Sequence, residues 1–205
     1  MNITDIKQQV KRQGRYSLFV DGKYAFSLSE AALLDSKLSV GRELNEVELA
    51  KFKQLSDDDK LYNNALAYAS LRPRSTWEME QYMQRKKSSP DLARKTLSKL
   101  SNIGLLDEEA FARSWVASRR LLKPTSRRKL LQELRAKRVA DDIAQKVLEE
   151  DGPDEHELLV ELIARKRKQT RYQDDQKLMR YLAGQGFGYG DIKDALDQAG
   201  YQPNV

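Results

Sequence analysis

Three stretches of this chain share one register of residues, and this repeat restricts the folds that are open to it. Copies of the repeat start at Ser75, Ser126 and Asp174, 51 and 48 residues apart. All three residues favour the N-terminal cap of a helix. Each copy has Met or Leu four and eight residues further on, positions that share one face of a helix. This spacing is close to that of helical repeat proteins.

Each copy extends in both directions from this central helix. An amphipathic segment precedes the cap, and a polar or glycine-bearing break follows the helix. A second apolar pair comes after the break, as with Ile143 and Val147 in the middle copy. The pattern predicts three helices in each copy, or about nine in all, from about residue 45 onward. We therefore predict a mainly α protein of tandem three-helix repeats, elongated because such units contact mainly their neighbours.

The first thirty residues follow a different pattern. Residues 15–29 alternate in polarity around Asp21-Gly22, a pair typical of a tight hairpin turn. Residues 3–11 are a candidate third strand, and Ser29 is a candidate cap for a short helix. We predict a small antiparallel sheet with a helix at residues 1–56. Repeats are expected at residues 57–109, 110–150 and 151–205.

Positive charge is concentrated in the middle repeat. Residues 110–150 hold 11 Lys or Arg against 5 acids, a net +6 that equals the charge of the whole chain. Within them, residues 118–138 hold nine bases and the single acid Glu133. A local field of one sign indicates a polyanionic partner. The alternative is a solvated helix face without a partner.

Several classes of protein find no support in the sequence. There is no cysteine and no long apolar run, so we expect a cytoplasmic, monomeric protein without membrane contact, disulfides or a thiolate metal site. The lone His156 has no catalytic pattern around it. Asp57–Asp59 lack the spacing of metal ligands and are expected to begin a helix. Residues 184–191 lack the Lys of a phosphate loop and are expected to form a turn. We predict no enzyme, cofactor or metal.

Four segments in order resemble the RecX family of recombination regulators. They are ALAYASLRPRSTWEMEQYMQRK, LSNIGLLDEEAFARSWVASRR, SRRKLLQELRAKRV and KLMRYLAGQGFGYGDIKDAL, within residues 60–198. The resemblance implies a regulator that binds the filament of the RecA recombinase and DNA, restrains the recombinase and needs no cofactor. The sequence departs from the family at Arg138, where the family usually has glycine. A side chain there is costly if φ is positive.

The basic residues that face away from the predicted core are the candidate contacts with DNA phosphates, single- or double-stranded, or with the filament. On a helical wheel, Leu130, Leu131 and Leu134 define the core face, whereas Arg128, Lys129 and Arg135 point away from it. The full set of candidates is Arg72, Arg74, Arg120, Arg127, Arg128, Lys129, Arg135, Lys137 and Arg138.

Some residues remain open to two interpretations. Arg120 is expected to face outward, whereas Arg119 lies nearer the core and is a candidate partner of Glu133. Arg72 and Arg74 flank Pro73 and either project from a stiff loop or cap the preceding helix. Trp77 and Trp115 are expected in the core. At the level of function, the alternative to a filament regulator is a sequence-reading DNA-binding regulator made of helix-turn-helix-like units, with a nuclease as a distant third.

Overall fold

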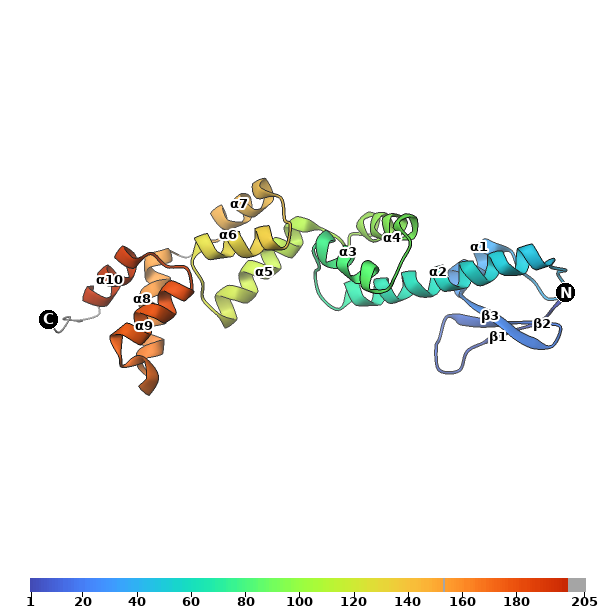
Figure 1. The fold of residues 1–205 in the computed structure, drawn as a ribbon, viewed down its shortest axis with the longest axis horizontal. Coiled ribbons are helices and arrows are strands. Elements are labelled where there is room, and N and C mark those ends of the chain that lie inside the picture. The colour runs from blue at the N-terminus through green and yellow to red at the C-terminus, as the bar shows by residue number, and fades with distance from the viewer. Residues whose placement is uncertain (153, 199–205) are drawn as a thin grey trace. The chain divides into compact units, whose positions relative to one another are not determined.

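The computed structural model describes residues 1–152 and 154–198, which form a small sheet followed by helices (Figure 1). The strands are β1 (Ile3–Gln8), β2 (Arg15–Val20) and β3 (Lys23–Ser29). The helices are α1 (Glu30–Ser36), α2 (Glu46–Ser70), α3 (Thr76–Arg85), α4 (Pro90–Asn102), α5 (Glu108–Leu122), α6 (Arg127–Ala136), α7 (Asp141–Glu149), α8 (Glu155–Arg167), the short 3-10 turn η1 (Thr170–Tyr172), α9 (Asp175–Gly184) and α10 (Tyr189–Gln198). Nine of the α-helices belong to the repeats, so the predicted mainly α fold is confirmed.

The sheet is antiparallel, with the strands in the order β1-β2-β3. Asp21 and Gly22 both have positive φ, at 47° and 77°, which is the geometry of the tight hairpin turn that their sequence predicts. Leu18 and Leu28 are fully buried on one face of the sheet. The predicted hairpin and third strand are confirmed.

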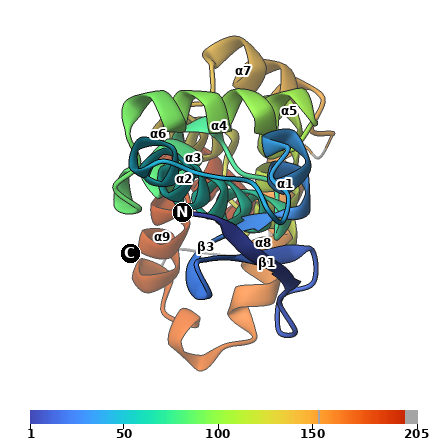
Figure 2. The same cartoon turned by 90° about the vertical axis from the view of Figure 1, so that its right-hand side faces the viewer.

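Helices α1 and α2 lie on the same face of the sheet, as Figures 1 and 2 show from two directions. Ser29 caps α1 by accepting a hydrogen bond from the Ala32 N–H at 3.3 Å. Phe52 of α2 stacks on Phe26 of β3, with ring centroids 6.1 Å apart. These contacts close the core of the N-terminal module, because three strands alone bury too little apolar surface to be stable.

Helix α2 also crosses the predicted boundary at residues 56–57 without a break. It runs from the sheet to α4 (Figure 1), and in its middle Asp59 forms a buried ion pair with Arg15 of β2 at 3.0 Å. Asp59 also accepts hydrogen bonds from the backbone and side chain of Ser29, at 2.8 and 2.5 Å. The prediction that Asp57–Asp59 begin a helix is therefore wrong. These residues lie mid-helix, where Asp59 holds the sheet onto α2.

The repeat register is confirmed at its caps and at its apolar positions. Ser75, Ser126 and Asp174 each accept a hydrogen bond from the backbone N–H three residues on, at 3.2, 3.2 and 3.0 Å. The residues four and eight positions beyond each cap are at most 1% exposed. They are Met79, Met83, Leu130, Leu134, Leu178 and Leu182.

The middle helix of every repeat ends in the same backbone conformation. Twelve residues after each cap stand Lys87, Arg138 and Gly186, with φ of 56°, 57° and 94°. This left-handed conformation favours glycine, and only the third repeat has one. A Cβ on Gly186 would lie 2.4 Å from Ser126 Oγ and 2.6 Å from Lys129 Cβ. A side chain is thus excluded there by contact as well as by φ.

The chain divides into two compact units. Unit 1 comprises Met1–Arg72 with Met79–Ile103, and unit 2 comprises Pro73–Glu78 with the chain from Gly104 onward. In unit 2 the second and third repeats have separate apolar cores, centred on residues such as Phe111 and Phe187. Among the described helices, none has the length and apolar character needed to cross a membrane.

Candidate nucleic-acid interface

The basic stretch 118–138 spans the last turns of α5, a short connection, and α6. The first turn of α6 contains Arg127, Arg128 and Lys129 and no acid, whereas α2, α5, α7, α8 and α9 all have acids in their first turns. The partial positive charge at a helix N-terminus makes a cation there unfavourable by ~0.3–1 kcal/mol. Three cations at this point therefore concentrate positive potential at one end of α6.

Two of these three cations have contacts within unit 2. The Arg127 guanidinium donates to the carbonyl of Asp151 at 3.1 Å, and its backbone N–H donates to the Glu155 carboxylate at 3.2 Å. The Lys129 ammonium donates to the carbonyl of Gly184, at the end of α9. Carbonyl acceptors leave the net charge unchanged, so both side chains remain sources of positive potential.

Arg128 and Arg138 are exposed at opposite ends of α6. Across the described ranges 1–152 and 154–198, neither side chain has a hydrogen bond or ion pair. The outward direction of Arg128 follows from the burial of Leu130 and Leu134, both 0% exposed. These two guanidinium groups are available to an external anion. The exposure of Arg128 agrees with its predicted position on the outward face of α6.

Lys123 shares this property, although it was not among the predicted contacts. It ends α5 and is exposed, and its ammonium has no ion pair within the part of the chain that the structure describes. The available signal was its position immediately before Pro124, which places it in a connection between two helices.

The prediction that Arg120 faces outward is wrong. Its side chain is 11% exposed and pairs with Asp151 at 2.5 Å. The same guanidinium donates to the carbonyl of Thr125 at 2.7 Å. Arg120 thus fixes the connection between α5 and α6. A phosphate would have to displace Asp151 to reach it.

The predicted partnership of Arg119 with Glu133 is confirmed. The guanidinium donates to the carboxylate at 2.8 Å, and Trp115 Nε1 donates to the same carboxylate at 2.9 Å. Arg119 also lies over the Trp115 ring, 4.8 Å from its centroid. The only acid of the basic stretch is therefore used internally, and it neutralises a residue close to the core.

Lys137 is also held internally. Its ammonium pairs with Glu78 at 2.8 Å and lies 5.6 Å and 5.1 Å from the ring centroids of Trp77 and Trp115. This arrangement joins α6 to the first turn of α3 by cation–π and ionic contacts. Both tryptophans are half-buried. They lie near the apolar core, as expected, but they also pack against the Lys137 ammonium. Lys137 therefore has a structural role, and a phosphate would have to compete with Glu78 for its ammonium.

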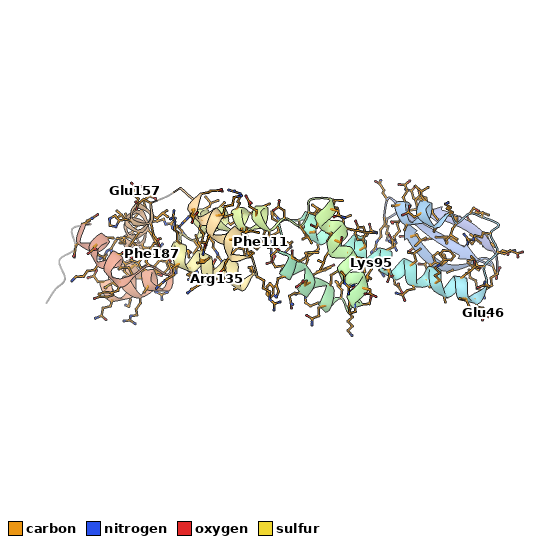
Figure 3. The ribbon with its side chains drawn as sticks, turned by 90° about the horizontal axis from the view of Figure 1, so that it is seen from above. Glu46, Lys95, Phe111, Arg135, Glu157 and Phe187 are labelled. Carbon is orange, nitrogen blue, oxygen red and sulfur yellow. The ribbon has the colours of Figure 1, made fainter. Side chains whose placement is uncertain are left out.

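Arg135 lies on the exposed side of α6 and pairs with Asp141 through two hydrogen bonds of 2.8 Å. Figure 3 labels Arg135 among the side chains of this part of unit 2. The hydrogen bond from Arg135 lowers the pKa of Asp141 below its usual range. The pair is half-exposed, at 49% and 57%, so a competing phosphate can reach Arg135 at the expense of this bond.

The two arginines beside Pro73 differ in position. Arg72 is exposed at the end of α2, as expected for a projecting side chain. Arg74 is only 9% exposed and lies 3.9 Å from the Glu78 carboxylate. Of the two interpretations, projection from the loop is therefore wrong for Arg74, because its charge faces Glu78 within the first turn of α3.

The arrangement offers cations for phosphate or carboxylate groups and no grouping typical of catalysis. Its exposed members in unit 2 are Lys123, Arg127, Arg128, Arg135 and Arg138. Guanidinium groups form paired hydrogen bonds with phosphate oxygens. The surface is therefore suited to a polyanion and carries no sign of sequence reading in itself.

Comparisons with known proteins cover nearly the whole chain. The model of the regulatory protein RecX N-terminal domain matches residues 1–45. The models of the first, second and third three-helix domains of RecX match residues 62–100, 107–148 and 154–196. These matches follow the N-terminal module and the three repeats in order.

Individual relatives agree with these models. The chain is 30% identical to the regulatory protein RecX of Bacillus subtilis over 98% of this chain and 78% of that protein. It is 34% identical to the RecX of Lactobacillus johnsonii over 75% of this chain and 56% of that protein. A crystal structure of regulatory protein RecX matches with a TM-score of 0.70 and 28% identity, covering 94% of this chain and 98% of the other. With its sheet, its three repeats and their order all matched, the chain belongs to the RecX family of regulatory proteins.

Proposed function

We propose that this protein binds DNA phosphates and the filament of a RecA-type recombinase, and that it lowers ATP hydrolysis and strand exchange by the filament without catalysis of its own. The observation that carries the proposal is the group of exposed cations around α6. Arg128 and Arg138, with no acid partner among the described residues, are its centre. In a member of the RecX family, such a surface fits a partner made of nucleic acid and recombinase.

The alternative is a regulator that reads a DNA sequence, and the charges of the third helices of the second and third repeats argue against it. A helix that enters the major groove must pass between phosphates. The exposed residues of α7 include Asp141, Asp142 and Glu149, and those of α10 include Asp191 and Asp194. These acids would be repelled by the DNA backbone. Phosphate binding by the α6 surface needs no such insertion.

The test adds the protein to recombinase filaments on single-stranded DNA and follows ATP hydrolysis and strand exchange. The wild type is expected to lower both rates. The double variant Arg128→Glu with Arg138→Glu is expected to lose most of this effect, because each reversal replaces an attractive contact with repulsion. A matched control changes Arg180 and Lys193 to Glu. These two exposed residues lie on α9 and α10, and the control has the same net charge as the variant.

Binding to DNA alone gives a second measurement. Affinity for a single strand should fall by about 0.7 log units per tenfold increase in salt for each phosphate contacted. The Arg128→Glu and Arg138→Glu variant should show a slope shallower by about 1.4, whereas the control should keep the wild-type slope. Filaments that behave identically with an excess of wild-type protein would refute the regulatory function. Equal inhibition by wild type and variant would refute the role of the α6 surface.

A further inference from the structure

A second basic site lies in unit 1, whereas α6 belongs to unit 2. A pocket of about 220 Å³ is formed between the β1–β2 loop and the middle of α2. Arg12 and Gly14 of the loop, Arg15 of β2, and Lys60 and Asn64 of α2 contribute to its lining. Its volume lies below the ~300–1,000 Å³ of sites for drug-sized molecules. The pocket therefore fits a small group better than a whole nucleotide.

No acidic side chain lines this pocket. Arg12 and Lys60 are exposed, and within residues 1–152 and 154–198 neither side chain has an ion pair or a hydrogen bond. Asp59, the residue before Lys60 in α2, is buried and pairs with Arg15. Arg12 and Lys60 are thus left without a paired acid, which favours an anion at this site.

Arg15 adds buried donors to these exposed charges. Its side chain is 9% exposed, and it donates to Ser27 Oγ at 3.0 Å, to the Ser27 carbonyl at 2.9 Å and to Asp59 at 3.0 Å. A guanidinium has five N–H donors, so the bonds found among the described residues leave two of them over. Each of its three nitrogens thus has one acceptor, and Arg15 contributes to the wall of the pocket beside Arg12 and Lys60.

The pocket continues on the other side of Lys60 and Asn64. A second hollow of about 400 Å³ shares both residues and extends to Lys86 and Lys87 in the turn between α3 and α4. Asp57 and Asp58 also line it, so its cations outnumber its acids by one. Together the two hollows form a groove across α2, with cations from the β1–β2 loop, from α2 and from the α3–α4 turn, all within unit 1.

From this groove we infer a second DNA contact, in which the phosphodiester backbone lies across α2 with one phosphate in the pocket at Arg12, Arg15 and Lys60. A free phosphate would occupy only that pocket. A succession of cations along a groove is what a chain of phosphates requires. The inference rests on the proposed DNA binding, but it places a contact in the N-terminal module that is independent of α6.

The test uses the full-length chain and a fluorescent oligothymidine. The variant Arg12→Gln with Lys60→Gln removes two cations from the pocket. The control Lys23→Gln with Lys51→Gln removes two exposed cations of unit 1 that line neither hollow. Lys51 is nine residues before Lys60 in α2, which places it on the opposite side of the helix. The pocket variant should lower the dependence of log affinity on log salt by about 0.7, the value for one phosphate contact on a single strand, and the control should not.

A cross-linking experiment reports the position of the DNA directly. The chain has no cysteine, so Asn64→Cys creates a unique thiol in the groove to which a photoreactive group is attached. Irradiation should join this variant to the oligonucleotide, whereas the same group at Lys51→Cys should give little product. Inorganic phosphate at high concentration should reduce the product by competing for the pocket.

The outcomes separate this inference from the proposed function. If wild-type protein binds DNA and the α6 variant is impaired, but the pocket variant keeps its slope and Asn64→Cys gives no cross-link, only the second contact is refuted. If the pocket variant loses filament inhibition with unchanged DNA binding, the groove faces protein and the inference is likewise overturned. If the wild type binds no DNA, both proposals fail at that point.

Discussion

Identical charged groups have different tasks in the stretch 118–138, and burial distinguishes them. Arg120 is 11% exposed and paired with Asp151, whereas Arg128 is exposed with no pair among the described residues. A buried pair costs stability when one partner is removed, because the other charge remains without compensation. An exposed arginine can be removed with little effect on the fold.

This contrast predicts opposite results for the same substitution at two positions. Arg120→Met should lower the free energy of unfolding by about 2–3 kcal/mol, since Asp151 is then left largely buried without a partner. Arg128→Met should change it by no more than about 0.5 kcal/mol. Urea unfolding of both variants measures the difference. Equal effects at the two positions would contradict the assignment of Arg120 to the structure.

Arg138 and Gly186 both have a left-handed backbone after the middle helix of their repeat, and substitutions at the two positions should change stability in opposite directions. Arg138→Gly should stabilise the protein by about 1 kcal/mol, because φ of 57° is strained for a side chain. Gly186→Ala should destabilise it by about 2 kcal/mol, because the new Cβ meets Ser126 and Lys129. Thermal unfolding measures both signs, with Arg138→Lys as the control that keeps charge and strain. If Arg138→Gly also weakens DNA binding, the charge of Arg138 contributes to binding, and the strained backbone is the cost of having a side chain at this turn.

Local periodicity predicted the outward directions of Arg128 and Arg135 correctly, whereas Lys129, predicted to point outward, is only partly exposed and contacts Gly184 of α9. Long-range pairing explains where the predictions were wrong. The directions of Arg128 and Arg135 follow from a helical wheel, because they depend only on neighbouring residues of one helix. The partner of Arg120 is 31 residues away in the chain, and Lys137 meets Glu78 at a separation of 59 residues. No periodic pattern contains such pairs, so the sequence alone gave these cations no partners.

Among the helices, α5 and α7 of the second repeat are joined by a charged cluster. Glu109 of α5 pairs with Lys146 of α7 at 2.9 Å, and with Arg113 of α5 at 2.7 Å. The hydrogen bond from Lys146, followed by that from Arg113, lowers the pKa of Glu109 below its ordinary value of 4.5. The carboxylate is therefore more easily ionised in the folded than in the unfolded chain.

This shift predicts the direction of a pH effect. A carboxyl group with a lowered folded pKa contributes stability that is fully present above its unfolded pKa, here near 4.5. That contribution is lost as pH falls through the lower folded value. The melting temperature of Glu109→Gln should thus be below that of the wild type at pH 7, and the gap should close as pH falls below about 4. A gap that stays constant over this range would show that ionisation of Glu109 is not involved.

Helix α2 continues through residue 56, where the sequence predicted a domain boundary. Independent folding of residues 1–56 therefore stays a prediction. The sequence signalled a change from strands to helices, and that change is real at Asn45, which caps α2 at a distance of 2.8 Å to the Glu48 N–H. The three acids at residues 57–59 resembled a helix start because the partner of Asp59, Arg15, is 44 residues away in the sequence. The ion pair of Arg15 with Asp59 makes α2 part of the N-terminal core and of the first repeat together.

In the whole molecule, tryptophan fluorescence reports on only one of the two units, whereas far-UV circular dichroism reports on both. Both tryptophans of the chain, Trp77 and Trp115, belong to unit 2. Asp59→Ala should destabilise unit 1 by about 3 kcal/mol, since it leaves the buried Arg15 without its partner. We expect its thermal transition to move to lower temperature in far-UV circular dichroism, with the tryptophan fluorescence transition unchanged. Coincident shifts by both probes would mean that the units unfold as one.

The crowded cations at the start of α6 have a consequence for the unbound protein. Arg127, Arg128 and Lys129 repel one another and the positive end of the helix, and dissolved ions screen that repulsion over about 10 Å at 0.1 M. Added salt should therefore strengthen this helix while it weakens any complex with a polyanion. The ions of the buffer stabilise the free protein, and they compete with its partner for the same charges.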